Sequence, residues 1–102
     1  MVTTGASEPR VAAPARLRTV RLALGQIAPK LGDVGANLDL HLEGIEAARA
    51  QRAGLVLFPE LSMAGYQLKD LVPDVALNGR SPEFARLVAA SAGMAAGFGF
   101  VE

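Results

Sequence analysis

Apolar residues follow two different spacings along this chain, and these spacings predict three strands and two helices. From Thr19 to Gln26 apolar and polar positions alternate, which is typical of a strand with one well-buried face. The buried side would consist of Val20, Leu22 and Leu24. Leu55 to Phe58 is a run of large apolar residues, which predicts a strand buried on both faces, as in a parallel sheet. Met94 to Val101 predicts a third buried strand, whose small residues indicate close approach of another backbone.

The first helix is predicted between the first two strands. Asp33 is a plausible N-cap, because its carboxylate can accept from free backbone N–H groups at a helix start. Apolar residues then recur every three or four positions and form one stripe, which consists of Val34, Leu38, Leu42, Ile45 and Ala48. We expect Gly54 to supply the left-handed residue that ends this helix near Ala53.

The second helix is predicted from its start signal. Ser81 can cap the free N–H groups, and Pro82 suits the first helical position. We expect this helix to run to about Ala92. Residues 67–80 are too irregular for a regular element, apart from one helical turn near residues 68–72.

The order strand, helix, strand, helix, strand predicts an α/β fold with parallel neighbouring strands. Crossovers of this length join parallel strands by right-handed connections, which places both helices on one face of the sheet. The other face would then be bare, although both faces of a parallel sheet need cover. We therefore expect an apolar surface that requires a partner.

Residues 1–18 are predicted to be a disordered N-terminal tail, and residues 19–102 to be the folded part. The tail is rich in Ala, Pro, Ser, Thr and Gly and shows no periodicity. A transit peptide is a second interpretation, but Pro9 and Pro14 would interrupt its amphipathic helix, so the plain extension is favoured.

Composition excludes several classes of function. Ten basic and ten acidic residues give a net charge of zero, so nothing indicates binding to nucleic acid or to a membrane surface. The absence of cysteine excludes disulfides, thiolate metal sites and a cysteine nucleophile within these 102 residues. No apolar run is long enough to cross a bilayer and no secretory signal is present, so a cytoplasmic location is expected. No glycine-rich phosphate loop opens a helix, and no cofactor is expected.

Glu60 is the main candidate for chemistry. Pro59 cannot donate to a strand ladder, so the second strand ends there and Glu60 follows at its carboxyl end. Ligands of open α/β sheets bind at the carboxyl ends of the strands. Desolvation beside the apolar strand would favour proton uptake by Glu60, as a general base requires. The plainer interpretation is a solvated acid that caps exposed N–H groups in a loop.

The run Phe-Pro-Glu-Leu-Ser-Met-Ala-Gly-Tyr, from Phe58 to Tyr66, resembles the first catalytic signature of the nitrilase superfamily of carbon-nitrogen hydrolases. The resemblance extends back through Gly25 to Val34 and Asn37, and forward through Gly97 to Glu102. It implies that the chain is the first part of a nitrilase-like four-layer α-β-β-α sandwich, amino-terminal and incomplete.

The resemblance also implies a mechanism. In this family a glutamate, a lysine and a cysteine hydrolyse a non-peptide C–N bond, and only the glutamate has a match here, at Glu60. The other two would lie beyond Glu102, so we expect the chain alone to be inactive. A small-molecule amide, nitrile or carbamoyl substrate is implied, and the complete protein is expected to be a homo-oligomer.

Four further residues are candidates for a site. Tyr66 would line the substrate site or simply pack the loop, and Glu102 is a weaker substrate-binding candidate at the end of the third strand. Lys69 lies too soon after Glu60 to match the family's lysine, and we interpret it as solvated. His41 has no second ligand in view, so a histidine at the core boundary is favoured over a metal site.

Two alternatives to the hydrolase remain open. One is a non-catalytic α/β binding or assembly module that docks a partner through its exposed sheet face. The other is a self-contained small-ligand or nucleotide-binding module. The segment from Gly65 to Leu71 is similar to the glutamine-hydrolysing domains attached to NAD synthetases as well as to free-standing amidases, so the substrate stays open.

Overall fold

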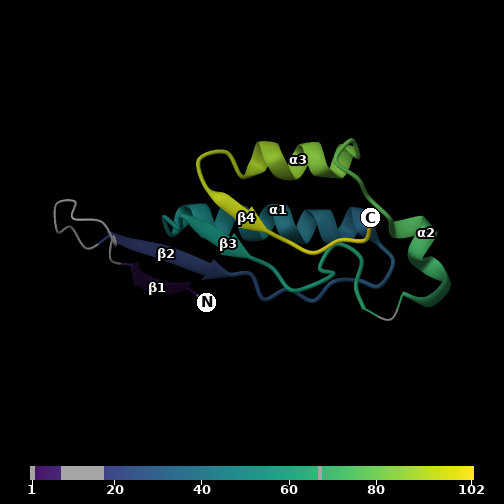
Figure 1. The fold of residues 1–102 in the computed structure, drawn as a ribbon, viewed down its shortest axis with the longest axis horizontal. Coiled ribbons are helices and arrows are strands. Elements are labelled where there is room, and N and C mark those ends of the chain that lie inside the picture. Colours follow the sequence, from purple (N-terminus) through teal and green to yellow (C-terminus); the bar gives the residue numbers. More distant parts are fainter. Residues whose placement is uncertain (1, 8–17, 67) are drawn as a thin grey trace.

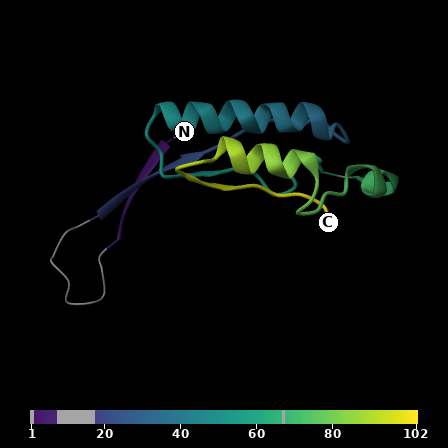
Figure 2. The ribbon, with the colours of Figure 1, turned by 90° about the horizontal axis from the view of Figure 1, so that it is seen from above.

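A computed structural model describes residues 2–7, 18–66 and 68–102 of the chain (Figure 1). Its elements are arranged as an α/β fold, in which α1 and α3 lie along the same face of a four-stranded sheet (Figure 2). In chain order the elements are β1 (Val2–Ser7), β2 (Arg18–Leu24), α1 (Val34–Ala50), β3 (Leu55–Leu57), the 3-10 helix η1 (Lys69–Leu71), α2 (Val72–Val75), α3 (Pro82–Ala90) and β4 (Ala95–Gly97).

The three predicted strands are parallel neighbours, as the long crossovers indicate. β2 pairs with β3 with Ala23 opposite Val56, and β3 pairs with β4 with Val56 opposite Ala96. All three strands end before their predicted ends, at Leu24, Leu57 and Gly97. Beyond β4, the carbonyls of Gly99 and Val101 accept from the N–H groups of loop residues rather than from a strand. The third strand therefore ends early because its continuation is paired with loops.

β1 differs from the disordered tail that the sequence predicts. The backbone of Val2–Ser7 pairs with β2 as an antiparallel edge strand. The outer edge of β2 carries N–H and C=O groups that need partners, and an extended segment of almost any composition can supply them. Residues 8–17 of the expected tail lie outside the described residues. Arg18, the last residue of the expected tail, begins β2.

α1 begins where the sequence predicts, but it ends differently. The Asp33 carboxylate accepts a hydrogen bond from the N–H of Ala36 at 2.9 Å, which confirms the N-cap. The helix ends at Ala50, and the left-handed residue after it is Arg52, with a φ of 59°, rather than Gly54. The N–H of Ala53 donates back to the carbonyl of Ala48 at 3.0 Å, and this closing bond holds Arg52 in its conformation.

α3 keeps its predicted position but not its predicted cap. The hydroxyl of Ser81 accepts from the backbone N–H of Asn78 at 2.9 Å, so it closes the preceding turn and does not cap the helix. The helix ends at Ala90, two residues before the expected end. The single helical turn expected near residues 68–72 is longer in the structure, where η1 and α2 together reach Val75.

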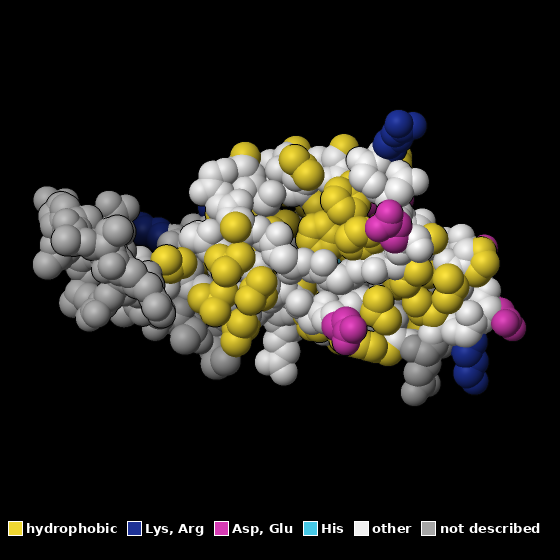
Figure 3. Space-filling view, in the orientation of Figure 1, with side chains coloured by type: hydrophobic (Ala, Val, Ile, Leu, Met, Phe, Trp, Pro, Cys, Tyr) yellow, Lys and Arg dark blue, Asp and Glu magenta, His cyan; other side chains and the backbone are white. Residues whose placement is uncertain are grey.

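The core lies between the two helices and one face of the sheet. Its buried residues include Ala23, Leu38, Ile45, Ala48, Val56, Met63 and Leu87. The side of β2 that was predicted to be buried lies on the other face, because side chains alternate and Ala23 points to the helices. Val20 and Leu57 are 48% and 40% exposed there. Figure 3 shows hydrophobic side chains gathered on this uncovered face, as the predicted bare sheet requires.

Candidate active site

Glu60 lies at the carboxyl ends of the three parallel strands. It follows β3, the strand between β2 and β4, by three residues. The N–H of Gly25 donates to the carbonyl of Leu57 at 2.6 Å, and the N–H of Phe58 donates to the carbonyl of Gly97 at 2.8 Å. These bonds tie the ends of all three strands together, so the loop that carries Glu60 starts from a fixed edge.

The loop continues as a tight turn with Glu60 and Leu61 at its centre. The N–H of Ser62 donates to the carbonyl of Pro59 at 3.1 Å and closes this turn. Leu61 has a φ of 52°, in the left-handed region that a branched side chain seldom adopts. Such a conformation costs on the order of 1 to 2 kcal/mol, so other contacts must hold it. The sequence carries no local signal for it, because Leu61 is not a glycine.

Gly99 packs directly against this turn. Its carbonyl accepts from the N–H of Met63 at 3.0 Å. A Cβ atom on Gly99 would lie 2.2 Å from the Leu61 nitrogen and 2.9 Å from the Glu60 carbonyl carbon. The small residues of the third strand predicted close approach of another backbone, and at Gly99 that backbone is the Glu60 turn itself.

A buried polar cluster lies beneath the turn. It consists of Asn37 and His41 on α1 and Ser62 on the loop, and all three are fully buried. The Asn37 side-chain NH₂ donates to the carbonyls of Lys30 and Met63 at 2.8 and 3.0 Å, and its side-chain oxygen accepts from the Lys30 N–H at 2.6 Å. Asn37 therefore joins the segment before α1 to the loop after β3.

His41 is fully buried. It therefore lies deeper than the predicted position at the core boundary. Its Nδ1 lies 2.6 Å from the carbonyl oxygen of Asn37, and its Nε2 lies 2.7 Å from Oγ of Ser62. A carbonyl can only accept, so Nδ1 carries the proton and Nε2 of the neutral ring accepts from the Ser62 hydroxyl. The ring also packs against Phe58 at a centroid distance of 4.4 Å.

Sequence reasoning missed this cluster, although one signal was present. Asn37 and His41 are one helical turn apart, beside the apolar stripe of α1, so both polar groups face the core. Buried polar groups are hydrogen-bonded in folded proteins. The spacing therefore predicts a buried network, but it does not identify Ser62 as the partner.

Burial makes the stability of the fold depend on pH through His41. Desolvation lowers the pKa of His41 below its ordinary value of 6.5, and the hydrogen bond with the Asn37 backbone opposes this only in part. As the pH falls below 6.5, the unfolded chain binds this proton before the folded chain does. The contribution of neutral His41 to the free energy of unfolding is therefore fully present above pH 6.5. It is lost as the pH falls from there towards the lower pKa of the folded state, at no more than about 1.4 kcal/mol per pH unit.

We expect denaturant titrations of the complete protein at about pH 7 and about pH 5 to show this loss. The readout is the difference between the wild type and His41→Leu, which lacks the ionisable ring. The variant should be less stable at neutral pH but should lose less stability on acidification. An identical pH dependence in the two proteins would contradict the assignment.

The four acid, amine and phenol candidates are all at the surface of the described chain. Glu60 is exposed, so the described residues do not supply the desolvation expected for it. Tyr66 is 48% exposed, and Lys69 and Glu102 are also exposed. Within residues 18–66 and 68–102, no hydrogen bond or ion pair joins Glu60 to any of the other three. The structure thus packs the Glu60 backbone against Gly99, and among the described residues it joins Glu60 to none of the other candidates by a hydrogen bond or ion pair.

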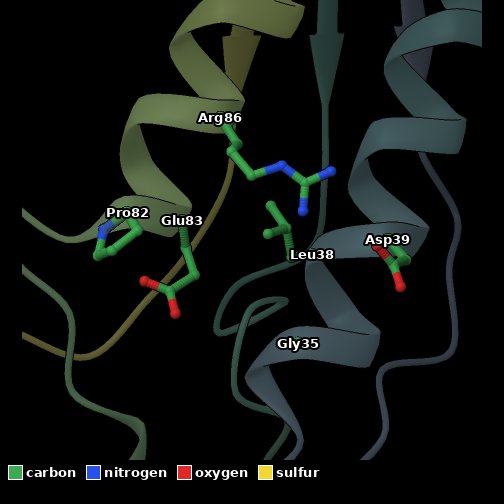
Figure 4. A pocket seen from close by; sticks show the side chains of 6 residues that line it. All are labelled: Gly35, Leu38, Asp39, Pro82, Glu83 and Arg86. Atoms are coloured by element: carbon green, nitrogen blue, oxygen red, sulfur yellow. The ribbon is translucent and has the colours of Figure 1, made fainter.

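Among the described residues, hollows also occur away from Glu60. One of about 380 Å³ lies between α1 and α3, and Figure 4 shows Arg86 of α3 extending over Leu38 towards α1. Another, of about 360 Å³, lies between β2 and α1. Glu60 lines neither. In the part of the chain that the structure describes, no cluster of three metal-ligating side chains occurs, and no helix has the length and apolar character to cross a membrane.

The fold and the loop together define an α/β protein with a carboxylate at the ligand-binding edge of its parallel strands. Residues 21–102 match the family model described as carbon-nitrogen hydrolase. The chain therefore belongs to the carbon-nitrogen hydrolase family, which confirms the resemblance to the nitrilase superfamily. Its strands and helices are consistent with part of a nitrilase-like fold.

Several relatives share the sequence over parts of the chain. A glutamine-dependent NAD(+) synthetase of Acinetobacter baylyi is 36% identical over 63% of this chain, and one of Xanthomonas campestris pv. campestris is 37% identical over 80%. A third, of Thermotoga maritima, is 36% identical over 55% of the chain. The chain spans only 12%, 15% and 10% of the lengths of these three proteins. No solved structure matched the chain.

Proposed function

We propose that the complete protein carrying this chain hydrolyses a carbon–nitrogen bond of a small amide, with Glu60 as the general base. The observation that carries the proposal is the position of Glu60 within a carbon-nitrogen hydrolase chain. It lies on a constrained turn at the carboxyl ends of three parallel strands, and the described residues give its side chain no competing hydrogen bond or ion pair.

In the proposed reaction Glu60 accepts the proton of the attacking nucleophile and later passes it to the leaving amine. An amide and water then give a carboxylic acid and ammonia. This chain contains no cysteine, and its two lysines, Lys30 and Lys69, are exposed. The nucleophile and the lysine that the family resemblance implies would thus come from residues outside this chain.

The uncovered face of the sheet supports a site that Glu60 shares with residues outside this chain. Strand side chains such as Val20 and Leu57 are exposed on it, and burial of such a face is strongly favourable. In a sandwich of two face-to-face sheets a second sheet would cover it and would lower the dielectric around Glu60. The same exposed face also favours a second candidate function, that of a non-catalytic module that docks a partner there.

We propose glutamine as the substrate, since several relatives are glutamine-dependent NAD(+) synthetases. Ammonia release by the complete protein should be measured from glutamine, a simple primary amide, a nitrile and an N-carbamoyl compound. We expect kcat/KM to be highest for glutamine. Faster hydrolysis of the nitrile or carbamoyl compound would contradict the substrate, and no ammonia from any of them would favour the docking module.

The remaining expectations belong to the same proposal. A cytoplasmic location and a homo-oligomeric assembly are further predictions for the complete protein. Tyr66, on the same loop as Glu60 and partly exposed, is proposed to contact the substrate, whereas Glu102 is a weaker candidate for that role.

A further inference from the structure

Ser62 is the fourth residue of the turn that carries Glu60, and it is the point at which the turn is attached to the rest of the fold. Its backbone N–H closes the turn on Pro59 at 3.1 Å, while its side chain reaches His41 on α1 at 2.7 Å. The same hydroxyl oxygen lies 3.4 Å from the N–H of Gly99, beyond β4. One side chain thus joins the loop to a helix and to the segment after a strand.

The bonds of this side chain form a directed chain. The carbonyl of Asn37 fixes the proton of His41 on Nδ1, so Nε2 presents a lone pair to the loop. The Ser62 hydroxyl donates to that lone pair and accepts from Gly99. Because every member is satisfied and no water or solvent contact is needed, the network has one arrangement and resists rotation of the loop.

The attachment matters because the turn is held in an unfavourable conformation. Leu61, between Glu60 and Ser62, has its φ at 52°. Without an anchor on the far side, this residue would relax towards a common conformation and would rotate the preceding peptide with it. Asn37, through Met63, supplies a second anchor one residue further along the loop at 3.0 Å.

We propose that the His41–Ser62 hydrogen bond, seated on Asn37, positions the Glu60 turn for proton transfer, so that His41 and Ser62 are positioning residues of the hydrolase site. The catalytic part of this inference rests on the proposed function. The anchoring part does not, because it concerns how the loop is held. Neither residue touches the reacting atoms in this assignment.

The test compares Ser62→Ala with a matched control, Ser91→Ala, in the complete protein. Ser91 also donates a hydrogen bond through its hydroxyl, but it does so at the end of α3, to the backbone carbonyl of Val88 at 3.1 Å. Ser62→Ala should lower kcat about 10-fold with little change in KM, because the base is misplaced while substrate binding is kept. Ser91→Ala should leave both parameters unchanged.

A second readout does not depend on activity. Hydrogen exchange of the peptide covering residues 59–65 should become about 10-fold faster in Ser62→Ala, while peptides of α1 and α3 keep their protection. Unchanged exchange of this peptide would overturn the anchoring. Faster exchange with unchanged kcat would overturn the positioning role, and the network would then be purely structural.

A double-mutant cycle with His41→Leu shows whether the two residues act through one bond. If they do, the double variant should lose about as much kcat as either single variant, not the product of both losses. Independent, multiplicative losses would contradict the proposal. If the wild type releases no ammonia from any substrate, the proposed function fails, but the exchange experiment still decides how the loop is held.

Discussion

Glu60→Gln should abolish amide hydrolysis by the complete protein and leave its fold intact. Glutamine has nearly the same shape as glutamate but cannot accept a proton at neutral pH, so the step that needs a base is lost. We expect kcat to fall by about 1,000-fold or more. The described residues give the Glu60 side chain no hydrogen bond or ion pair, so its replacement removes no stabilising contact that the structure shows. Ammonia release and a thermal melt measure the two effects.

Glu43→Gln is the matched control for this prediction. Glu43 is an exposed acid on α1, and among the described residues it also has no hydrogen bond or ion pair through its carboxylate. Surface changes of this kind usually alter the free energy of unfolding by less than about 0.5 kcal/mol. Activity should therefore stay at the wild-type level. Glu60→Gln with kcat within twofold of the wild type would refute the role of Glu60 as the base.

The position of Glu60 could be predicted because it depends on local chemistry. The run from Leu55 to Phe58 has no polar face, and Pro59 cannot continue a ladder, so the strand end and the acid after it are encoded within a few residues. Asp33 caps α1 for a similarly local reason. The parallel pairing follows from the length of the crossovers alone.

Features that depend on contacts between distant segments could not be predicted from the sequence. The alternation from Val20 to Leu24 indicates two faces but cannot say which of them the helices cover, and in this chain they cover the face of Ala23. Ser62 lies 21 residues from His41, and no periodicity links a loop serine to a helix histidine. The left-handed Leu61 likewise follows from packing against residues beyond β4, not from its own preference.

Gly99→Ala should damage both stability and activity, since the added methyl group has no space. Its Cβ would lie 2.2 Å from the Leu61 nitrogen and 2.9 Å from the Glu60 carbonyl carbon, and both are backbone atoms that cannot rotate away. The chain must therefore shift either the segment after β4 or the Glu60 turn. Overpacking of this kind costs about 1 to 3 kcal/mol or more. Displacing a catalytic group by about 1 Å lowers the rate about 100-fold.

Gly79→Ala separates this steric effect from the general effect of replacing a glycine. No atom lies within 4 Å of a Cβ built on Gly79, and its φ is not in the left-handed region, so its free energy of unfolding should change little or rise slightly. Activity per folded molecule, measured well below the melting transition of each variant, then reports the displacement of Glu60 rather than unfolding. Gly99→Ala with wild-type stability and kcat would show that the two backbones are not in contact. Loss of stability with normal kcat would show that the segment after β4 moves while the Glu60 turn stays in place, held by its bonds to α1.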